Sequence, residues 1–481
     1  MTFPVSSRRN LLKNVACGFG SLAFSGMALA NGSTSVGAVR SPSNPANVNV
    51  PSNDLVPDNL VPKAKRIIFI FMQGGPSQVD TFDPKSALDK YHDTKVEFLN
   101  ARSRKLSKEN IFKSPWKFKE HGECGRAVSE LFPHMANCVD DFCLIKSMHT
   151  DGVAHGPATL FLHTGATNLI RPSVGSWVTY GLGTENQNLP SFVTINPPPT
   201  KGGPRNYGNA FLPTQHQAVV IGKPGEGTGD GIKNLSNRKY SKLEQRRQFD
   251  FLQRLNQAQA GGGAADERLN ATIRSYELAF RMQQTAPSVI DINNESEHTK
   301  KMYGIDEKAT DEFGRQCLLA RRFAEEGVRY IQVSYSDLKS TPRWDQHSNM
   351  KNHEVHAKAT DKPVAGLLQD LKQRGLLEDT IVWWGGEFGR TPFSQNKDGR
   401  DHNPNGLSIW LAGGGVKQGF AFGETDEFGH NAISNKVHMH DLHATLLHLM
   451  GINHKELTYR YAGRDFRLTD VYGRVIDGII A

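Results

Sequence analysis

Carboxylates and imidazoles gather after one of the apolar runs of the chain. The segment WDQHSNMKNHEVH places Asp345 and His347 two positions apart, and His402 follows later in RDHNP. A short carboxylate and a ring nitrogen on the same loop can reach one ion, and a set of this kind suits a divalent cation. The sequence therefore predicts a metal site with Asp345, His347 and His402 as ligands. The two imidazoles favour zinc or manganese, with calcium as an alternative.

Three further residues are placed to carry chemistry beside such an ion. Glu387 directly follows an apolar run, where a charge needs a partner, so it could be a further ligand or a general base. Arg390 could clamp an anionic group with its planar guanidinium. His155 opens the segment HGPATLFLHTG, in which Gly156 and Pro157 fix the ring at the start of a predicted helix. We therefore expect His155, Glu387 and Arg390 to be the catalytic residues.

Four more polar residues are candidates for the lining of the pocket: Gln73, Ser77, Asp80 and Asp401. The first three follow the apolar run IIFIFM, and the fourth precedes His402. Structural roles are the alternative to pocket lining, because Ser77 could cap a turn and Asp80 could form a turn. His353 lies in the same segment as two of the predicted ligands. It could belong to the site or, equally, to a solvated helix face.

Apolar runs of strand length indicate the elements that must position these residues. They cover residues 67–72, 328–335, 380–386 and 407–414. Strands that are apolar on both faces are typical of a mostly parallel sheet covered by helices. A helical pattern at 362–375, with Gly375 as its stop, lies between two of them. The sequence therefore predicts an α/β fold with its active site at the carboxyl ends of the strands.

The rest of the chain divides by composition. A twin-arginine pattern, SRRNLLK, precedes a short apolar stretch that is interrupted by glycines and ends in Ala-x-Ala. This is typical of an export signal, and the stretch is too short and broken for a stable membrane span. Residues 195–240 are rich in loops, and two polar helices are predicted to follow at about 241–258 and 266–285. The predicted organisation is a signal over 1–30, a disordered linker over 31–62 and one domain over 63–481, with 195–300 as an insertion or cap. We expect a periplasmic or otherwise exported protein.

Charge and cysteine content bear on two further properties, nucleic-acid binding and disulfide bonding. The 481-residue chain has a net charge of +8, but its basic residues are dispersed and form no stripe interleaved with aromatics. Nucleic acid is therefore not an expected partner. Cys124, Cys138 and Cys143 lie close together in sequence. An oxidising compartment permits a disulfide among them, and buried free thiols are the equal alternative.

Three segments resemble the sulfatases in the right order. HGPATLFLHTG resembles their signature, in which Cys or Ser precedes x-Pro-Ser-Arg, an apolar stretch and Thr-Gly. Residues 366–389 resemble the segment that ends in Ser-Asp-His-Gly, and residues 440–452 resemble a later Asp-Leu-x-x-Thr-Leu-Leu helix. The resemblance implies the three-layer alkaline phosphatase-like fold, with a mostly parallel sheet and helices on both faces.

Other segments, including GGPSQVDTFDPK and residues 385–429, resemble an uncharacterised sulfatase-like family with the label DUF1501. The chain departs from the sulfatase pattern where the chemistry is done. His155 stands at the position of the nucleophile, and Gln73 and Glu387 replace metal-binding residues. By position, Asp345 and His347 fall where the phosphatase branch holds its other metal.

Two functions follow from the resemblance and the residues together. The first is an exported metal-dependent hydrolase of sulfate or phosphate esters, acting on a small anionic ester or on a sulfated or phosphorylated glycan. In it, His155 could attack, act as an acid or base, or bind metal. The alternative is a catalytically remodelled pseudoenzyme that binds an anionic glycan or a protein partner. Bound metal distinguishes the two.

Overall fold

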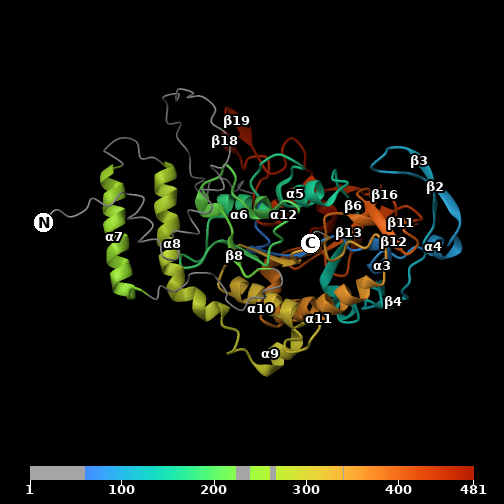
Figure 1. The fold of residues 1–481 in the computed structure, drawn as a ribbon, viewed down its shortest axis with the longest axis horizontal. Coiled ribbons are helices and arrows are strands. Elements are labelled where there is room, and N and C mark those ends of the chain that lie inside the picture. The colour runs from blue at the N-terminus through green and yellow to red at the C-terminus, as the bar shows by residue number, and fades with distance from the viewer. Residues whose placement is uncertain (1–59, 224–238, 260–266, 340) are drawn as a thin grey trace.

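The computed structural model describes residues 60–223, 239–259, 267–339 and 341–481 (Figure 1). The predicted signal and nearly all of the predicted linker lie outside the described residues. No helix among the described residues is both long enough and apolar enough to cross a bilayer.

A central sheet of nine strands organises the fold. Its order is β14 (Ala421–Phe422), β6 (Phe142–His149), β13 (Leu407–Ala412), β10 (Thr380–Gly385), β1 (Arg66–Met72), β9 (Tyr330–Tyr335), β7 (Phe192–Ile195) and β8 (Val219–Ile221), and β17 (Val437–His438) also pairs with β6. All neighbouring pairs are parallel except those of β13, which runs antiparallel to both β10 and β6. The four predicted strands and the mostly parallel sheet are confirmed.

Helices cover both faces of this sheet (Figure 1). One face packs against α5 (His155–Thr164), α6 (Val174–Leu182) and α12 (Met439–Leu449), and the other against α10 (Asp311–Glu325) and α11 (Asn352–Gln373). Strand β1 is buried along its whole length because alternate side chains enter the two cores. Its apolar character on both faces is therefore what a central strand needs. The predicted three-layer α/β class is confirmed.

Helix α11 starts ten residues before the predicted segment, at Asn352. Its first turns are polar in sequence but bury residues at helical spacing, among them His353, which is fully buried. The ring of His353 accepts the backbone N–H of Ser77 at 3.3 Å, and burial holds its pKa well below the usual value. His353 is therefore not on a solvated face. The predicted stop is confirmed, because Gly375 follows the helix with φ +69°.

The segment predicted as an insertion contributes to the main sheet as well. It contains β8, which pairs with β7 at the sheet edge, and the two predicted helices, α7 (Lys242–Gln259) and α8 (Glu267–Ile290). α8 contacts α10, one of the covering helices. Shorter elements complete the chain: α3 (Gln78–Thr81), α4 (Ser86–Lys90), α9 (Glu297–Met302), and the two-stranded sheets β2–β3 (Lys95–Leu99, Leu106–Asn110), β4–β5 (Phe118–His121, Arg126–Ser129), β11–β12 (Gly389–Gln395, Gly399–Asn403), β15–β16 (Glu424–Thr425, Ala432–Ser434) and β18–β19 (Tyr459–Tyr461, Arg464–Phe466).

The described cysteines are free thiols, so of the two alternatives the structure shows unpaired sulfur. Cys138 and Cys143 are buried, and burial raises the pKa of each thiol to about 12. Neither is therefore a nucleophile at neutral pH.

Candidate metal centre

Three elements bring four of the predicted site residues to the carboxyl end of the sheet. The loop after β9 carries Asp345 and His347, and the hairpin β11–β12 carries His402. The first residue of α5 is His155. One ligand atom from each of these four residues lies within 4.8 Å of the other three. Residues from three distant parts of the sequence thus form one group.

Three distances within this group can be compared with the ligand spacing of a single small ion. Nε2 of His347 lies 2.9 Å from Oδ1 of Asp345, and Nε2 of His402 lies 3.3 Å from the same oxygen. The two Nε2 atoms are 3.1 Å apart. Bonds of about 2.1 Å at octahedral or tetrahedral angles place neighbouring ligand atoms about 2.9–3.4 Å apart. These three distances are therefore compatible with ligands around one divalent cation.

The outer nitrogens of the three rings all have acceptors. Nδ1 of His155 lies 2.6 Å from Glu387, Nδ1 of His402 lies 3.1 Å from the Val153 carbonyl, and Nδ1 of His347 contacts the Gln395 amide oxygen. An acceptor at Nδ1 keeps the proton there and leaves the Nε2 lone pair facing the centre.

Those lone pairs need a positive charge between them. Nε2 of His155 is buried without a hydrogen-bond partner, although it lies 3.0 Å from Oδ2 of Asp345. Three neutral rings that point lone pairs at one carboxylate repel one another. Protons or a metal ion must therefore occupy the centre, and the residues fit a divalent metal.

Glu387 supports His155 from behind. Its side chain is fully buried, and its two oxygens accept the backbone N–H of Gly74 at 3.1 and 3.0 Å. Gly74 has φ +112°, and a Cβ there would lie 2.8 Å from backbone nitrogens of Trp344 and Asp345. Glycine therefore lets this backbone pass close beneath the metal ligands. In this position Glu387 orients the ring rather than facing a substrate.

Arg390 supports Asp345 in the same way. It is fully buried, and its Nη2 lies 2.8 Å from Oδ1 of Asp345. Its other donors meet backbone carbonyls, with Nε on Gly75 at 3.0 Å, Nη1 on Arg400 at 3.2 Å, and Nη2 also on Gly74 and Trp344. Because Arg390 is fully buried and each of its three nitrogens already has an acceptor, the geometry favours a positioning role over the predicted one.

Two of the predicted lining residues belong to a buried network instead. Ser77 donates to Asp80 at 2.5 Å, and Arg400 donates to both oxygens of Asp80 at 2.6 and 3.1 Å. Asp80 and Arg400 are both fully buried. Gln73 is also buried, and neither atom of its amide has a hydrogen-bond partner. Asp80 is therefore engaged by Arg400 and Ser77 and does not belong to the group of candidate ligands.

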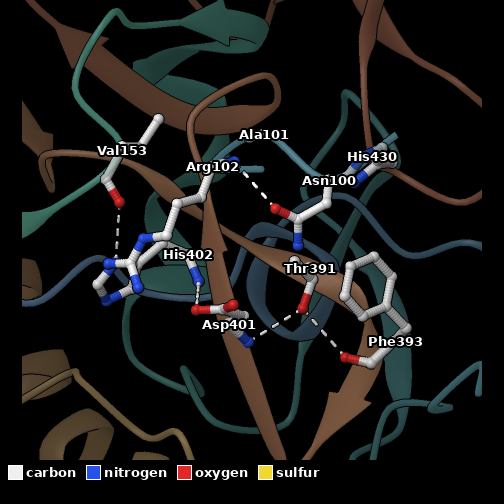
Figure 2. Close-up of a pocket in the computed structure, with 9 residues that line it drawn as sticks. All are labelled: Asn100, Ala101, Arg102, Val153, Thr391, Phe393, Asp401, His402 and His430. Carbon is white, nitrogen blue, oxygen red and sulfur yellow. Dashed lines mark hydrogen bonds between the residues drawn. The ribbon is translucent and has the colours of Figure 1, made fainter. Parts of the chain in front are cut away.

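A pocket opens beside the centre (Figure 2). It is open to solvent and is lined by Asn100, Ala101, Arg102, Val153, Thr391, Phe393, Asp401, His402 and His430. His402 is thus both a candidate ligand and part of the wall, and Asp401 beside it is 34% exposed. Of the four candidate ligands, His402 is the one that lines this pocket. The sequence did not indicate Gln395 or Val153, because an amide or carbonyl acceptor leaves no motif.

Protonation of the rings opposes metal binding. The hydrogen bond to Asp345 raises the pKa of His347. Burial would lower the pKa of His155, but the carboxylates of Asp345 and Glu387 outweigh it and raise that pKa too. Burial lowers the pKa of His402.

We expect the apparent metal affinity to fall as the pH drops, beginning above about 6.5, the ordinary pKa of histidine. The metal-free protein holds protons on His155 and His347 more tightly than free histidine does, and these protons must leave before metal binds. Zinc titrations against a chromophoric chelator between pH 8 and pH 5.5 measure this, with a slope approaching two protons per ion. A constant affinity between pH 8 and pH 6 would contradict the assignment.

Replacing Glu387 by glutamine should weaken metal binding by about 10–100-fold, the usual effect of losing a partner of a ligating histidine. The amide is neutral, so it stabilises the Nδ1 proton of His155 less strongly than the carboxylate does. A chelator competition measures the affinity. The matched control is Glu354→Gln on α11, because Glu354 accepts from Trp116 and lies outside the metal group. Equal affinities for the two variants would exclude the positioning role.

Comparison with known proteins supplies a family and a loose likeness of fold. Solved structures that match include a lipoteichoic acid synthase from Listeria monocytogenes, with a TM-score of 0.34 and 11% identity over 88% of this chain and 78% of that one. A phosphonate monoester hydrolase from Silicibacter pomeroyi matches with a TM-score of 0.35 and 9% identity over 80% of this chain and 73% of that one. A sulfatase from Pseudoalteromonas sp. also matches, with a TM-score of 0.32 and 10% identity over 81% of this chain and 68% of that one. At these scores nothing about activity follows.

No curated protein sequence matches the chain. The family model described as a protein of unknown function, DUF1501, matches residues 64–480, which is nearly the whole of the described structure. The chain therefore belongs to the DUF1501 family.

Proposed function

We propose that the protein is a metal-dependent hydrolase of sulfate or phosphate esters. The observation that carries this proposal is the convergence of three Nε2 atoms and one carboxylate, each held from behind, at the edge of a pocket. Imidazole nitrogens with one carboxylate suit zinc or manganese better than calcium, which prefers six or more oxygens. A bound ion would act as a Lewis acid toward an ester oxygen.

His155 acts as a ligand in this proposal rather than as a nucleophile. Its Nδ1 is engaged by Glu387, and its Nε2 faces the centre, so neither nitrogen is free to attack. Water is then the attacking group. It adds to phosphorus or sulfur as the bond to the ester oxygen breaks, and the departing alkoxide takes a proton from solvent. Asp401, at the pocket wall, is placed to accept the proton of the water.

The charge of the centre favours an anionic substrate. Asp345 and Glu387 carry two negative charges against the positive charge of Arg390, and the three rings are neutral when they bind metal. A divalent ion therefore makes the centre positive. A sulfate or phosphate group on a small molecule or on a glycan fits this charge. We further propose export in a folded, metal-loaded state, which the twin-arginine pattern in residues 7–13 supports.

Metal analysis and a substrate panel test this function. Mass spectrometry should find one zinc or manganese ion per chain, and a chelator should lower the melting temperature. Aryl sulfates, aryl phosphates and bis-aryl phosphates are then assayed with wild type and with His402→Ala. Protein that takes up no metal removes the proposal. Metal without turnover of any ester favours the pseudoenzyme, whose remodelled pocket binds an anionic glycan or a protein.

A further inference from the structure

The metal centre contains no free cation for an anionic substrate among its described ligands and supports. Arg390 is buried, and its donors meet Asp345 and four backbone carbonyls. Metal-ion sites that act on phosphate or sulfate commonly need a second positive group to hold the oxygens that do not react. The group must reach the pocket from another element.

Arg102 lines the pocket that also contains the candidate ligand His402. It is exposed, it lines the same hollow as Asp401 and His402, and its guanidinium has no hydrogen bond or ion pair with another described residue. Figure 2 shows its side chain extending from its hairpin toward His402. A guanidinium that stays charged, faces a metal ligand and is not paired to a carboxylate is available to an incoming oxyanion.

The hairpin that carries Arg102 is built to hold it in place. Arg102 lies in the turn of β2–β3, where the Asn100 side chain accepts the backbone N–H groups of Arg102 at 3.0 Å and Ser103 at 2.8 Å. The backbone of Arg104 closes the turn on the Asn100 carbonyl at 2.8 Å. The turn is therefore fixed by hydrogen bonds around Asn100, which itself lines the pocket.

Aromatic packing fixes the hairpin against the site. Phe98 on β2 contacts the rings of Phe393, Phe428 and His430, with centroids 5.1, 5.6 and 5.1 Å away. Phe393 belongs to β11, the strand that pairs with the His402 strand. The backbone of Arg102 is thus anchored to the same hairpin that supplies a metal ligand, so the distance between them is set by packed side chains.

We propose that Arg102 binds the tetrahedral oxyanion of the substrate, a sulfate or phosphate monoester or diester, in the pocket that it shares with His402. This inference rests on the proposed function and adds to it the residue that selects an anionic substrate. Arg102 holds the oxygens that do not face the ion. The long, planar guanidinium can donate two parallel hydrogen bonds to such a group, which a lysine cannot do.

Titration calorimetry with inorganic phosphate and with sulfate tests the proposal without turnover. Zinc-loaded wild type, Arg102→Ala and Arg102→Lys are compared with Lys105→Ala, which removes the same charge from the same hairpin but lies outside the pocket lining. Arg102→Ala should bind the anion about 10–100-fold more weakly, the effect of losing a charged hydrogen bond. Arg102→Lys should fall between, and Lys105→Ala should stay within about twofold.

The result separates this inference from the proposed function. If zinc binds but Arg102→Ala and Lys105→Ala hold the anion equally, or if wild type binds neither anion, Arg102 has no such role and the metal site stands. If no metal binds, the same titrations on protein as purified still compare Arg102→Ala with Lys105→Ala. A selective loss there supports the anion site alone.

Discussion

Replacing Asp345 by asparagine should abolish stoichiometric metal binding. Asp345 is the one carboxylate of the ligand group, and the three rings all approach it, at 3.0, 2.9 and 3.3 Å. Its charge also offsets the buried guanidinium of Arg390. The amide removes the negative charge that attracts the cation, so affinity should fall by more than the roughly 10–100-fold expected for a supporting residue. Mass spectrometry of the dialysed, zinc-loaded protein measures the loss.

The variant should also lose the stabilisation that zinc provides. With zinc in large excess over its dissociation constant, the free energy of unfolding of the wild type should be about 3–4 kcal/mol higher than that of the metal-free protein. The Asp345→Asn protein should unfold alike with and without zinc. Asp401→Asn is the matched control, because Asp401 lies in the pocket, 3.6 Å from His347, but outside the ligand group. Full zinc occupancy in Asp345→Asn would overturn the ligand assignment.

Replacing Asp80 by alanine should destabilise the fold by about 3–5 kcal/mol, the cost of leaving one charge of a buried pair without its partner. Asp80 and Arg400 are both fully buried and joined by two hydrogen bonds, and Ser77 also donates to Asp80. Arg400 would be left in the core without its carboxylate partner. Denaturant unfolding measures the change.

The same variant tests whether the buried network supports the fold without binding the metal itself. Because Asp80 contacts none of the four candidate ligands through a described hydrogen bond or ion pair, the folded Asp80→Ala protein should still bind one zinc ion. Asp465→Ala is the control for charge removal, since the Arg460–Asp465 pair is exposed and should cost about 1 kcal/mol or less. A stability change for Asp80→Ala no larger than this would contradict the account of the network.

The sequence predicted the sheet well because burial on both faces leaves a direct trace in composition. β1, β9, β10 and β13 all appear as continuous apolar runs. The short edge strand β8 left no such trace, because three residues cannot show a period and two of them are only half buried. The start of α11 was hidden in a similar way, since its first turns bury polar residues.

The candidate ligands Asp345, His347 and His402 could be predicted from residue type and position after strands, and the structure brings these three together with His155. What the sequence left open was the partner of each atom. Arg390 resembles an anion clamp until its carbonyl contacts are known, and His155 resembles a nucleophile until Glu387 is seen behind it. Arg102 carries no motif, because its role depends on how a distant hairpin packs.

The most direct test of the metal centre is anomalous X-ray diffraction at the zinc edge, from crystals of the zinc-loaded protein. The account predicts one strong anomalous peak per chain, about 2.0–2.2 Å from Nε2 of His155, His347 and His402 and from an oxygen of Asp345. No peak at this position, or a peak bound elsewhere while the four side chains bond to one another through protons, would contradict the claim that these residues form a metal site.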